Sequence, residues 1–251
     1  MGKVIAIANQ KGGVAKTTTA SSFAAGLKDR GYKVLVIDLD AQGNLSDSAE
    51  ADESRPTVYE IMKGSCKAGD AIQQKEPFDL IASKLDLAAA DMEFTQTGRE
   101  YKIKKALATV KESYDYIVLD TPPALGIMTA NAFMASDEVI IPVSGIDSLK
   151  GINNLFSTIE TMREYGNPNL KVAGILLTMY DARTKIDQTI KEVAEQAAGE
   201  LETKVFSTFI RRSKAVDEAK ATSMDIFSYN EKNNVAIDYS SFIDEYLKGE
   251  N

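Results

Sequence analysis

Residues 9–19, with the sequence NQKGGVAKTTT, decide the fold class of this chain. They follow an apolar segment with the pattern of a strand and lead into a helical pattern, which is the setting that a phosphate-binding loop requires. Gly12 and Gly13 let backbone N–H groups turn toward an anion, and the N-terminus of the following helix adds a partial positive charge. Lys16 would reach the β- and γ-phosphates of a nucleotide, and the Thr17 hydroxyl would bind Mg²⁺. The residues expected to contact the nucleotide are Gly12, Gly13, Val14, Ala15, Lys16, Thr17 and Thr18.

Short β-branched runs alternate with longer helical patterns along the rest of the chain. Strands are expected over residues 3–9, 33–38, 78–82, 116–120, 138–143, 172–178 and 204–209, and helices over residues 18–30, 99–112, 149–165, 186–198 and 235–248. Apolar runs such as VLVI at residues 34–37 suit strands that are covered on both faces. We therefore predict a doubly wound α/β fold, with a mostly parallel β-sheet flanked by helices, of the P-loop NTPase type. No segment resembles a linker, so a single domain over residues 1–251 is the simplest account.

The composition excludes several kinds of chemistry. The chain has no histidine, which removes Ser-His-Asp and Cys-His catalysis and histidine-ligated zinc. The single cysteine, Cys66, excludes disulfides within the chain and metal clusters held by the thiolates of one subunit. Neither a membrane-spanning segment nor a signal peptide is expected, and the expected location is the cytoplasm. The net charge of −8 argues against a surface that is basic all over, but it leaves room for a local basic patch.

Aspartates follow two of the expected strands. Residues 38–44 read DLDAQGN, and Asp38 and Asp40 lie on one side of the chain because side chains alternate along an extended segment. Residues 116–123 read YIVLDTPP, an apolar strand that ends in Asp120. Carboxylates beyond the carboxyl ends of parallel strands lie in the crevice where such sheets bind ligands. A carboxylate there can hold Mg²⁺ through water, because this ion keeps much of its hydration shell.

The phosphate loop departs from the general pattern G-x-x-x-x-G-K-[ST] at both outer glycines, which are Gln10 and Ala15 here. With Lys11, however, the stretch resembles the deviant Walker A motif K-G-G-V-G-K-T-T of the ParA/MinD family of ATPases. The DLDAQGN and DTPPALG segments also resemble motifs of that family, and the similarity extends over nearly the whole chain, with the short Soj-like proteins as the best match. Since Ala15 replaces the family's glycine, we predict a negative φ at this position, where alanine costs little.

This resemblance implies a Mg²⁺-dependent ATPase that uses ATP and forms a homodimer in its ATP-bound state. Lys11 would cross the dimer interface to the phosphates of the partner's ATP, and Asp40 would position the attacking water. Thr17 and, through water, Asp120 would hold the metal ion, with Asp38 as a further candidate ligand. The expected catalytic residues are Lys11, Lys16 and Asp40. Because the composition offers no strong base, intrinsic turnover is expected to be slow.

Members of the family differ in what they move. The segment 237–251 has apolar residues at helical spacing, but its four acidic residues against one lysine would be repelled by an anionic membrane. An N-terminal operator-binding domain, of the kind found in larger ParA proteins, is not expected. The resemblance to Soj-like proteins therefore implies non-specific DNA binding, association with the nucleoid in the ATP-bound state, and a ParB-like partner that stimulates hydrolysis.

The basic residues that would contact DNA are expected in the C-terminal half. Residues 203–220 carry a net charge of +3, against −11 for the rest of the chain. Arg183 and Arg212 match family positions implicated in DNA contact, and Lys214 belongs to the same basic stretch. Arg211 stands where the family usually has proline. A few such side chains suffice for weak, salt-sensitive binding to the DNA backbone, although a run of charge is more generally a solvated surface.

Two other classes of function remain open at this stage. One is a ParA-like ATPase that positions proteins and has no DNA role, which a failure to bind DNA at low salt would favour. The other is a biosynthetic enzyme on the same fold, of the dethiobiotin synthetase sort, that phosphorylates a small carboxylate. Enzymes of that class lack the lysine that corresponds to Lys11, and this argues against the second alternative. The sequence names neither the replicon nor the partner.

Overall fold

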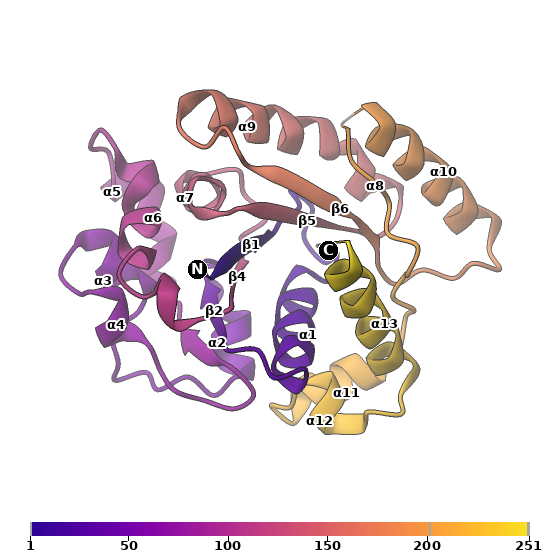
Figure 1. Cartoon of the computed structure of the whole chain (residues 1–251), viewed down its shortest axis with the longest axis horizontal. Helices are drawn as coiled ribbons and strands as arrows, with labels where there is room; N and C mark the ends of the chain where they lie inside the picture. The colour runs from indigo at the N-terminus through magenta and orange to yellow at the C-terminus, as the bar shows by residue number, and fades with distance from the viewer. Residues whose placement is uncertain (1, 201, 250–251) are drawn as a thin grey trace.

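The protein is described here by a computed structural model of residues 2–200 and 202–249. Within these residues, the strands are β1 (Lys3–Ile7), β2 (Val34–Asp38), β3 (Asp79–Ile81), β4 (Tyr116–Asp120), β5 (Glu138–Val143) and β6 (Lys171–Leu177). They form one sheet in the order β3-β2-β4-β1-β5-β6, and every neighbouring pair is parallel. The predicted doubly wound α/β fold is confirmed (Figure 1).

Helices connect the strands and cover the sheet. The α-helices of the described residues are α1 (Lys16–Asp29), α2 (Asn44–Ser48), α3 (Val58–Lys63), α4 (Ala68–Ala71), α5 (Ala90–Glu93), α6 (Lys102–Leu107), α7 (Ile127–Ala135), α8 (Ile146–Lys150), α9 (Ile152–Tyr165), α10 (Lys185–Glu200), α11 (Ala215–Ala221), α12 (Ile226–Asn230) and α13 (Asn234–Lys248). Short 3-10 helices span η1 (Leu85–Ala89), η2 (Arg99–Tyr101) and η3 (Lys111–Ser113). None of these helices combines the length and the apolar character that crossing a membrane would need.

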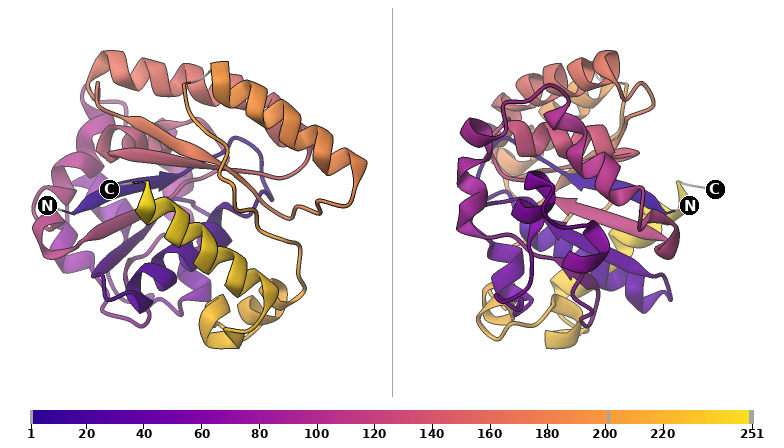
Figure 2. Two further views of the ribbon diagram at one scale, coloured as in Figure 1. Left: turned by 45° about the vertical axis from the view of Figure 1, so that its right-hand side comes forward. Right: turned by 90° about the vertical axis from the view of Figure 1, so that its left-hand side faces the viewer.

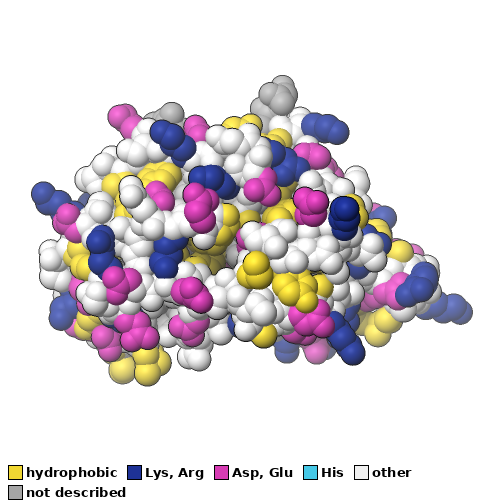
Figure 3. All heavy atoms as spheres, turned by 90° about the horizontal axis from the view of Figure 1, so that it is seen from below, with side chains coloured by type: hydrophobic (Ala, Val, Ile, Leu, Met, Phe, Trp, Pro, Cys, Tyr) yellow, Lys and Arg dark blue, Asp and Glu magenta, His cyan; other side chains and the backbone are white. Residues whose placement is uncertain are grey.

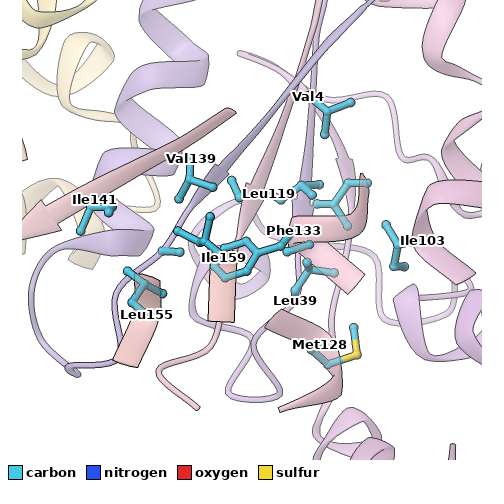
Figure 4. Packing of buried hydrophobic residues seen from close by; sticks show 14 of the residues in the cluster. Val4, Leu39, Ile103, Leu119, Met128, Phe133, Val139, Ile141, Leu155 and Ile159 are labelled. Carbon is cyan, nitrogen blue, oxygen red and sulfur yellow. The ribbon is translucent and has the colours of Figure 1, made fainter. Parts of the chain in front are cut away.

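The two faces of the sheet pack against different helices because side chains alternate along each strand. Val4 and Ala6 of β1 belong to a buried cluster with residues of α3, α6, α7 and α9, whereas Ile5 and Ile7 belong to a second cluster with α1 and α13. Figure 4 shows part of the first cluster, in which Phe133 of α7 lies among side chains of strands and helices. Figure 2 shows from two further sides how the helices enclose the sheet. This core holds the strand ends in fixed register.

The strand order reverses at β1, which lies between β4 and β5. The loops after β1, β2 and β4 therefore leave from neighbouring carboxyl ends, at the kind of switch point where open α/β sheets bind ligands. The register places Asp120 beside Ile7 on one side and beside Asp38 on the other. The fold thus brings the phosphate loop and both aspartate segments to one edge.

One predicted strand, over residues 204–209, is wrong. Val205 and Ile210 make only isolated parallel bridges to β6. Between them, the N–H groups of Ser207 and Thr208 turn away from β6 and donate to the carboxylate of Glu245, at 2.7 and 2.8 Å. A side chain of α13 thus takes the donors that a continuous strand would have given to the sheet. The other predicted strands are confirmed, with ends displaced by at most two residues.

Two predicted helices are interrupted. The pattern over residues 99–112 forms η2, α6 and η3 in succession, and the pattern over 149–165 is divided between α8 and α9 at Gly151. A Cβ atom at Gly151 would lie 3.2 Å from the side-chain oxygen of Gln10, so the glycine lets the phosphate loop approach this junction. The other predicted helices are confirmed within two residues as α1, α10 and α13.

Candidate nucleotide-binding site

The phosphate loop runs from the end of β1 to the first residue of α1, as predicted. The side chain of Asn9, which is 2% exposed, fixes its course. Its carbonyl oxygen accepts the N–H of Lys11 at 2.9 Å, and its amide donates to the carbonyl of Pro142 at 2.7 Å. Thr178, at the end of β6, donates its hydroxyl to the carbonyl of Val14 at 3.1 Å. Asn9 could not be assigned this role from the sequence, because one of its partners, Pro142, is 133 residues away along the chain.

The predicted negative φ at Ala15 is wrong. Ala15 has φ 63° and ψ 33°, in the left-handed region, and Gly13 also has a positive φ of 74°. The carbonyl of Ala15 already accepts the N–H of Thr19 at 2.8 Å, so the loop has to reverse within this residue for α1 to begin at Lys16. An alanine in this region is strained by about 1–2 kcal/mol relative to right-handed backbone. The chain therefore carries strain where the family has glycine.

Lys16 lies inside the loop rather than on the surface. Its side chain is buried, and Nζ donates to the carbonyl oxygen of Lys11 at 3.0 Å. Burial lowers the pKa of Lys16, while the charges of Asp120 and Asp40 oppose that shift. The fold therefore brings together Lys16 and the two carboxylates that the sequence placed near it.

Asp38 and Asp120 are both buried, at 0% and 1% exposure, but they are bonded differently. Asp38 accepts the N–H of Asp40 at 3.0 Å and both the N–H and the hydroxyl of Ser46, at 3.0 and 2.8 Å. Burial nevertheless raises the pKa of Asp38 to about 6. Among the described residues, neither carboxylate oxygen of Asp120 has a hydrogen-bond partner of good geometry, although the Thr17 hydroxyl lies close by. Burial and the charge of Asp38 raise the pKa of Asp120, against the opposite effects of Thr17 and Lys16.

Asp40 caps the turn that follows β2. Its Oδ1 accepts the N–H of Gln42 at 3.0 Å, and its carbonyl accepts the N–H of Gly43 at 2.9 Å. Its charge still acts on the pKa of Lys16. Asp40 therefore lies near Lys16 of the phosphate loop, as expected from the sequence, and it also stabilises the turn after β2.

Lys11 is exposed, unlike Lys16, and lies on the side of the loop that faces α8. The neighbouring Gln10 accepts a 3.4 Å hydrogen bond from the side chain of Asn154 in α9. In α8, Asp147 forms an ion pair with Lys150 at 2.8 Å, and Lys150 and then Lys11 lower the pKa of Asp147. The two lysines of the motif therefore occupy different places, one inside the loop and one at the surface.

The residues present fit a hydrated Mg²⁺ ion with a nucleotide. A buried carboxylate with two unpaired oxygens is costly unless a cation or donor compensates it. Asp120 has this character, and its pKa responds to both Thr17 and Lys16 at the start of α1. Thr17 and Asp120 would hold the metal ion. Asp38 has its oxygens engaged by Ser46 and Asp40, which makes it a support for the loop after β2 more than a ligand.

The predicted DNA-contacting residues are exposed but differ in how free their charges are. Arg183 forms a two-pronged ion pair with Asp181, at 2.9 and 2.7 Å, which lowers the pKa of Asp181 to about 2. Arg212 and Lys214 are exposed, with no ion pair among the described residues. Figure 3, a view from the side of α11 and α12, shows basic and acidic side chains interspersed, with no region of a single sign. The structure therefore shows no concentrated basic patch on this face.

Arg211 is partly exposed, but its charge is paired with a carboxylate of α13. It forms a two-pronged ion pair with the carboxylate of Asp238, at 2.6 and 2.8 Å, and donates to the carbonyl of Asn234. The segment after Ile210 is thereby attached to α13. In this chain an ion pair fixes the position where the family has proline.

Comparison with known proteins identifies the family. A family model described as an AAA domain matches residues 2–172. The sporulation initiation inhibitor protein Soj of Bacillus subtilis is 40% identical over 237 residues, which cover 92% of each chain. The chromosome partitioning protein ParA of Caulobacter vibrioides is 36% identical over 238 residues, covering 92% of this chain and 88% of that protein. The chain belongs to the ParA/Soj family of ATPases.

Solved structures agree with this ParA-type fold. A Mycobacterium smegmatis protein described as cobyrinic acid a,c-diamide synthase, with bound ATP analog and magnesium, has a TM-score of 0.84 at 34% identity, covering 100% of this chain and 96% of that one. A putative plasmid partition protein of Borrelia burgdorferi bound to AMPPNP has a TM-score of 0.82, and at 23% identity it shows the fold alone. Both of these neighbours were crystallised with an ATP analog, in the first case together with magnesium.

Proposed function

We propose that this ParA-type ATPase segregates DNA by forming an ATP-bound dimer that binds DNA without sequence preference. A ParB-like partner then stimulates ATP hydrolysis, which releases the protein from the DNA. The chromosome partitioning protein ParA of Caulobacter vibrioides, a relative, supports partition as the task. The observation that carries the nucleotide-dependent part is the buried, unpaired carboxylate of Asp120 beside Thr17 and Lys16. We further propose that residues 1–251 act as one domain in the cytoplasm, on the nucleoid when ATP is bound.

In this proposal the phosphates lie against the backbone N–H groups of residues 12–18 and against Lys16. The Nζ of Lys16 now bonds to the loop's own carbonyl at Lys11, and bound phosphate would compete for that ammonium group. Thr17 and, through water, Asp120 would hold a Mg²⁺ ion, which would supply charge compensation for the phosphates. Catalysis then depends on positioning and charge compensation.

Lys11 acts on the partner's nucleotide in the proposed dimer. Its exposure and its separation from Lys16 support a role outside its own loop, since a second phosphate-binding lysine in the same site would be expected to point inward. Two copies would therefore each complete the other's site. The contact of Gln10 with α9 holds this part of the loop in place.

Asp40 positions the water that attacks the γ-phosphate. Its carboxylate lies close enough to affect the pKa of Lys16, and the turn of residues 40–43 holds it. The chain has no histidine to serve as a base, so turnover without the partner is slow. We expect Asp40→Ala to bind ATP and to accumulate as an ATP-bound dimer.

The decisive experiment measures binding of a random-sequence duplex by the Asp40→Ala protein, with ATP and with ADP, over a series of salt concentrations. Binding that is stronger with ATP and weakens steeply with salt supports the proposal. Arg183→Glu, Arg212→Glu and Lys214→Glu test the predicted DNA-binding residues separately. A protein that is dimeric in ATP but binds no DNA at low salt would refute the DNA role and leave the ATPase intact.

An ATP-bound dimer that binds no DNA at low salt would favour the second candidate function, an ATPase that positions proteins. The structural similarity to a protein described as a biosynthetic synthase raises a third candidate. An exposed Lys11 near a buried Lys16 favours assignment as a ParA-type ATPase over assignment as a biosynthetic synthase. Small-molecule synthesis would be supported only by ATP turnover that depends on a carboxylate substrate and is unaffected by Lys11→Ala.

A further inference from the structure

A second strongly basic stretch of the chain lies outside the residues predicted to contact DNA. Residues 99–111 contain five lysines and arginines and one acidic residue, a net charge of +4 over a shorter span than residues 203–220. In the C-terminal stretch, Arg211 is neutralised by Asp238. The middle of the more basic stretch forms α6.

The lysines of α6 project from the face opposite to the core. Ile103 and Leu107 are 1% and 2% exposed and pack in the cluster under the sheet. Lys104 and Lys105 are exposed, and Lys102 is partly exposed. Because helical residues advance by 100° each, these lysines spread around one outward face of the helix.

None of the three lysines has an ion-pair partner among the described residues. Lys102 donates to the carbonyl of Met62 in α3, and Lys104 donates to the carbonyl of Gly166, after α9, at 3.4 Å. These contacts leave the positive charges uncompensated by carboxylates. The charges can therefore attract an anion from solvent.

Two tyrosines lie beside the lysines. The hydroxyl of Tyr101 donates to the carbonyl of Tyr165 at 2.9 Å, and the ring of Tyr165 is 73% exposed. We call Tyr101, Lys102, Lys104, Lys105 and Tyr165 the α6 surface. Its lysines supply positive charge, which is what contact with the phosphates of a nucleic acid requires.

The α6 surface is held rigidly. Asn131 of α7 is fully buried, and its side chain accepts the N–H of Ile103 at 3.1 Å and donates to the carbonyl of Arg99 at 3.0 Å. A charged surface on an anchored helix loses little conformational freedom on binding beyond that of the lysine side chains.

The α6 surface also lies away from the nucleotide. Gly166 leads into the start of β6, and α6 precedes β4, so both belong to the amino edge of the sheet. The phosphate loop leaves the carboxyl end of β1, at the other edge. Figure 1 shows α6 on the side where the N-terminus lies and α10 at the far side, and the right view of Figure 2 faces the α6 side. A dimer formed over the nucleotides would leave this surface open on both copies.

We propose that the α6 surface binds the phosphate backbone of double-stranded DNA. This inference rests on the proposed DNA-binding function and assigns it a surface. Lysines act as mobile point charges without the two-pronged geometry of arginine, which suits contact with phosphates regardless of base sequence. One copy carries a complete surface, so weak binding occurs with ADP as well as with ATP. The ATP-bound dimer binds more tightly because it presents the surface twice.

The test measures fluorescence anisotropy of a labelled random-sequence duplex over a salt series, with ADP and with ATP. It compares wild-type protein with Lys104→Glu/Lys105→Glu and Lys104→Gln/Lys105→Gln. Lys232→Glu/Lys248→Glu is the matched control, since it makes the same change in charge at two exposed lysines flanking or within α13, on the opposite face of the sheet. Thermal unfolding and ATP hydrolysis without DNA confirm that each variant is folded.

Both α6 variants are expected to lower the slope of log affinity against log salt by about 2 for one copy, with weaker binding in both nucleotide states. The control variant should bind as wild type does. Unchanged binding by both α6 variants would overturn the inference while leaving the proposed function standing, most directly if Arg212→Glu abolished binding. A loss equal to that of the control would mean that only total charge matters, which also overturns it. Absence of any DNA binding by wild-type protein in ATP would instead refute the proposed function.

Discussion

Asp38 and Asp120 are paired neighbours on β2 and β4, yet their buried carboxylates have opposite surroundings. Asp38 accepts three hydrogen bonds from Asp40 and Ser46, whereas within the described part of the chain Asp120 accepts none of good geometry and has only the Thr17 hydroxyl close by. One carboxylate therefore holds the loop after β2, and the other is left for a cation. Two residues that look alike in sequence thus have different consequences when substituted.

Replacement of Asp120 by asparagine should change the stability of the fold and the binding of ATP with Mg²⁺ in opposite directions. We expect Asp120→Asn to raise the thermal unfolding midpoint of the nucleotide-free protein, because it removes an unpaired buried carboxylate. The Mg²⁺-dependent part of ATP affinity should fall, by roughly 10–100-fold. Titrations of ATP with Mg²⁺ and with a chelator measure the second effect.

Asp38→Asn is the comparison, and it should lower the unfolding midpoint instead. An amide cannot accept all the hydrogen bonds that the carboxylate takes from Ser46 and Asp40, at a cost of about 1–3 kcal/mol. If Asp120→Asn destabilised the protein and left Mg²⁺ dependence unchanged, the assignment of Asp120 would be wrong.

Ala15→Gly should relieve the strain in the phosphate loop. Glycine adopts the observed φ of 63° freely, and after the greater chain entropy of unfolded glycine is subtracted, a net stabilisation of about 0.5 kcal/mol remains. ATP affinity should rise as well, because the loop then adopts its anion-binding conformation without backbone strain at residue 15. Chemical denaturation and nucleotide titration measure the two effects.

Gly13→Ala is the matched change in the opposite direction. Gly13 has φ 74°, and a Cβ atom there would meet nothing within 4 Å, so only backbone strain is altered. It should destabilise the protein by about 1 kcal/mol. Shifts of opposite sign for the two variants would support strain as the cause, and a destabilising Ala15→Gly would contradict it.

Substitution of the two lysines of the loop should impair different properties of the protein, ATP binding in one case and dimer formation in the other. Lys16→Ala removes the buried ammonium group within the loop and should abolish ATP binding. Lys11→Ala changes an exposed side chain and should leave ATP binding by the monomer within about twofold, while the ATP-dependent dimer is lost. Equilibrium nucleotide binding and sedimentation in ATP distinguish these outcomes. Loss of nucleotide binding in Lys11→Ala would mean that the two roles are misassigned.

Glu245 gives a pH-dependent contribution to stability. Burial alone would raise its pKa, but the N–H groups of Ser207 and Thr208 outweigh this effect and lower the pKa of Glu245. A carboxyl group with a lowered pKa in the folded state stabilises the fold above its unfolded pKa of about 4.3, and this contribution is lost as the pH falls further.

Glu245→Gln should therefore destabilise the protein at neutral pH by about 1 kcal/mol, since the carboxylate is only partly buried. The difference from wild type should shrink as the pH falls below about 4. Denaturant unfolding at a series of pH values measures it, and Glu192→Gln, which changes an exposed carboxylate of α10, is a control that should leave Ser207 and Thr208 bonded. A difference independent of pH would show that the charge of Glu245 is not involved.

The phosphate loop, Asp40 and Asp120 could be predicted from sequence because each follows a short apolar run whose residue types suit only a buried parallel strand. Their meeting at one edge then follows from the parallel arrangement. The prediction of a strand over residues 204–209 was wrong because a side chain distant in the sequence changes the hydrogen bonding of this segment. Its apolar residues do contact β6, but Glu245, 38 residues away from Ser207, competes for its N–H groups.

Local residue patterns by themselves determined the α/β fold class, the loop that binds phosphates and the order of its acidic partners, since strand, turn and helix preferences act between residues close in the chain. Only the tertiary structure decided that Ala15 is left-handed, that Arg211 is tied to Asp238 and that Asp120 has no hydrogen-bond partner of good geometry among the described residues. Each of these depends on which distant groups the packed sheet and helices bring within hydrogen-bonding distance. The charge on α6 was readable in the sequence, but its freedom from ion pairs was not.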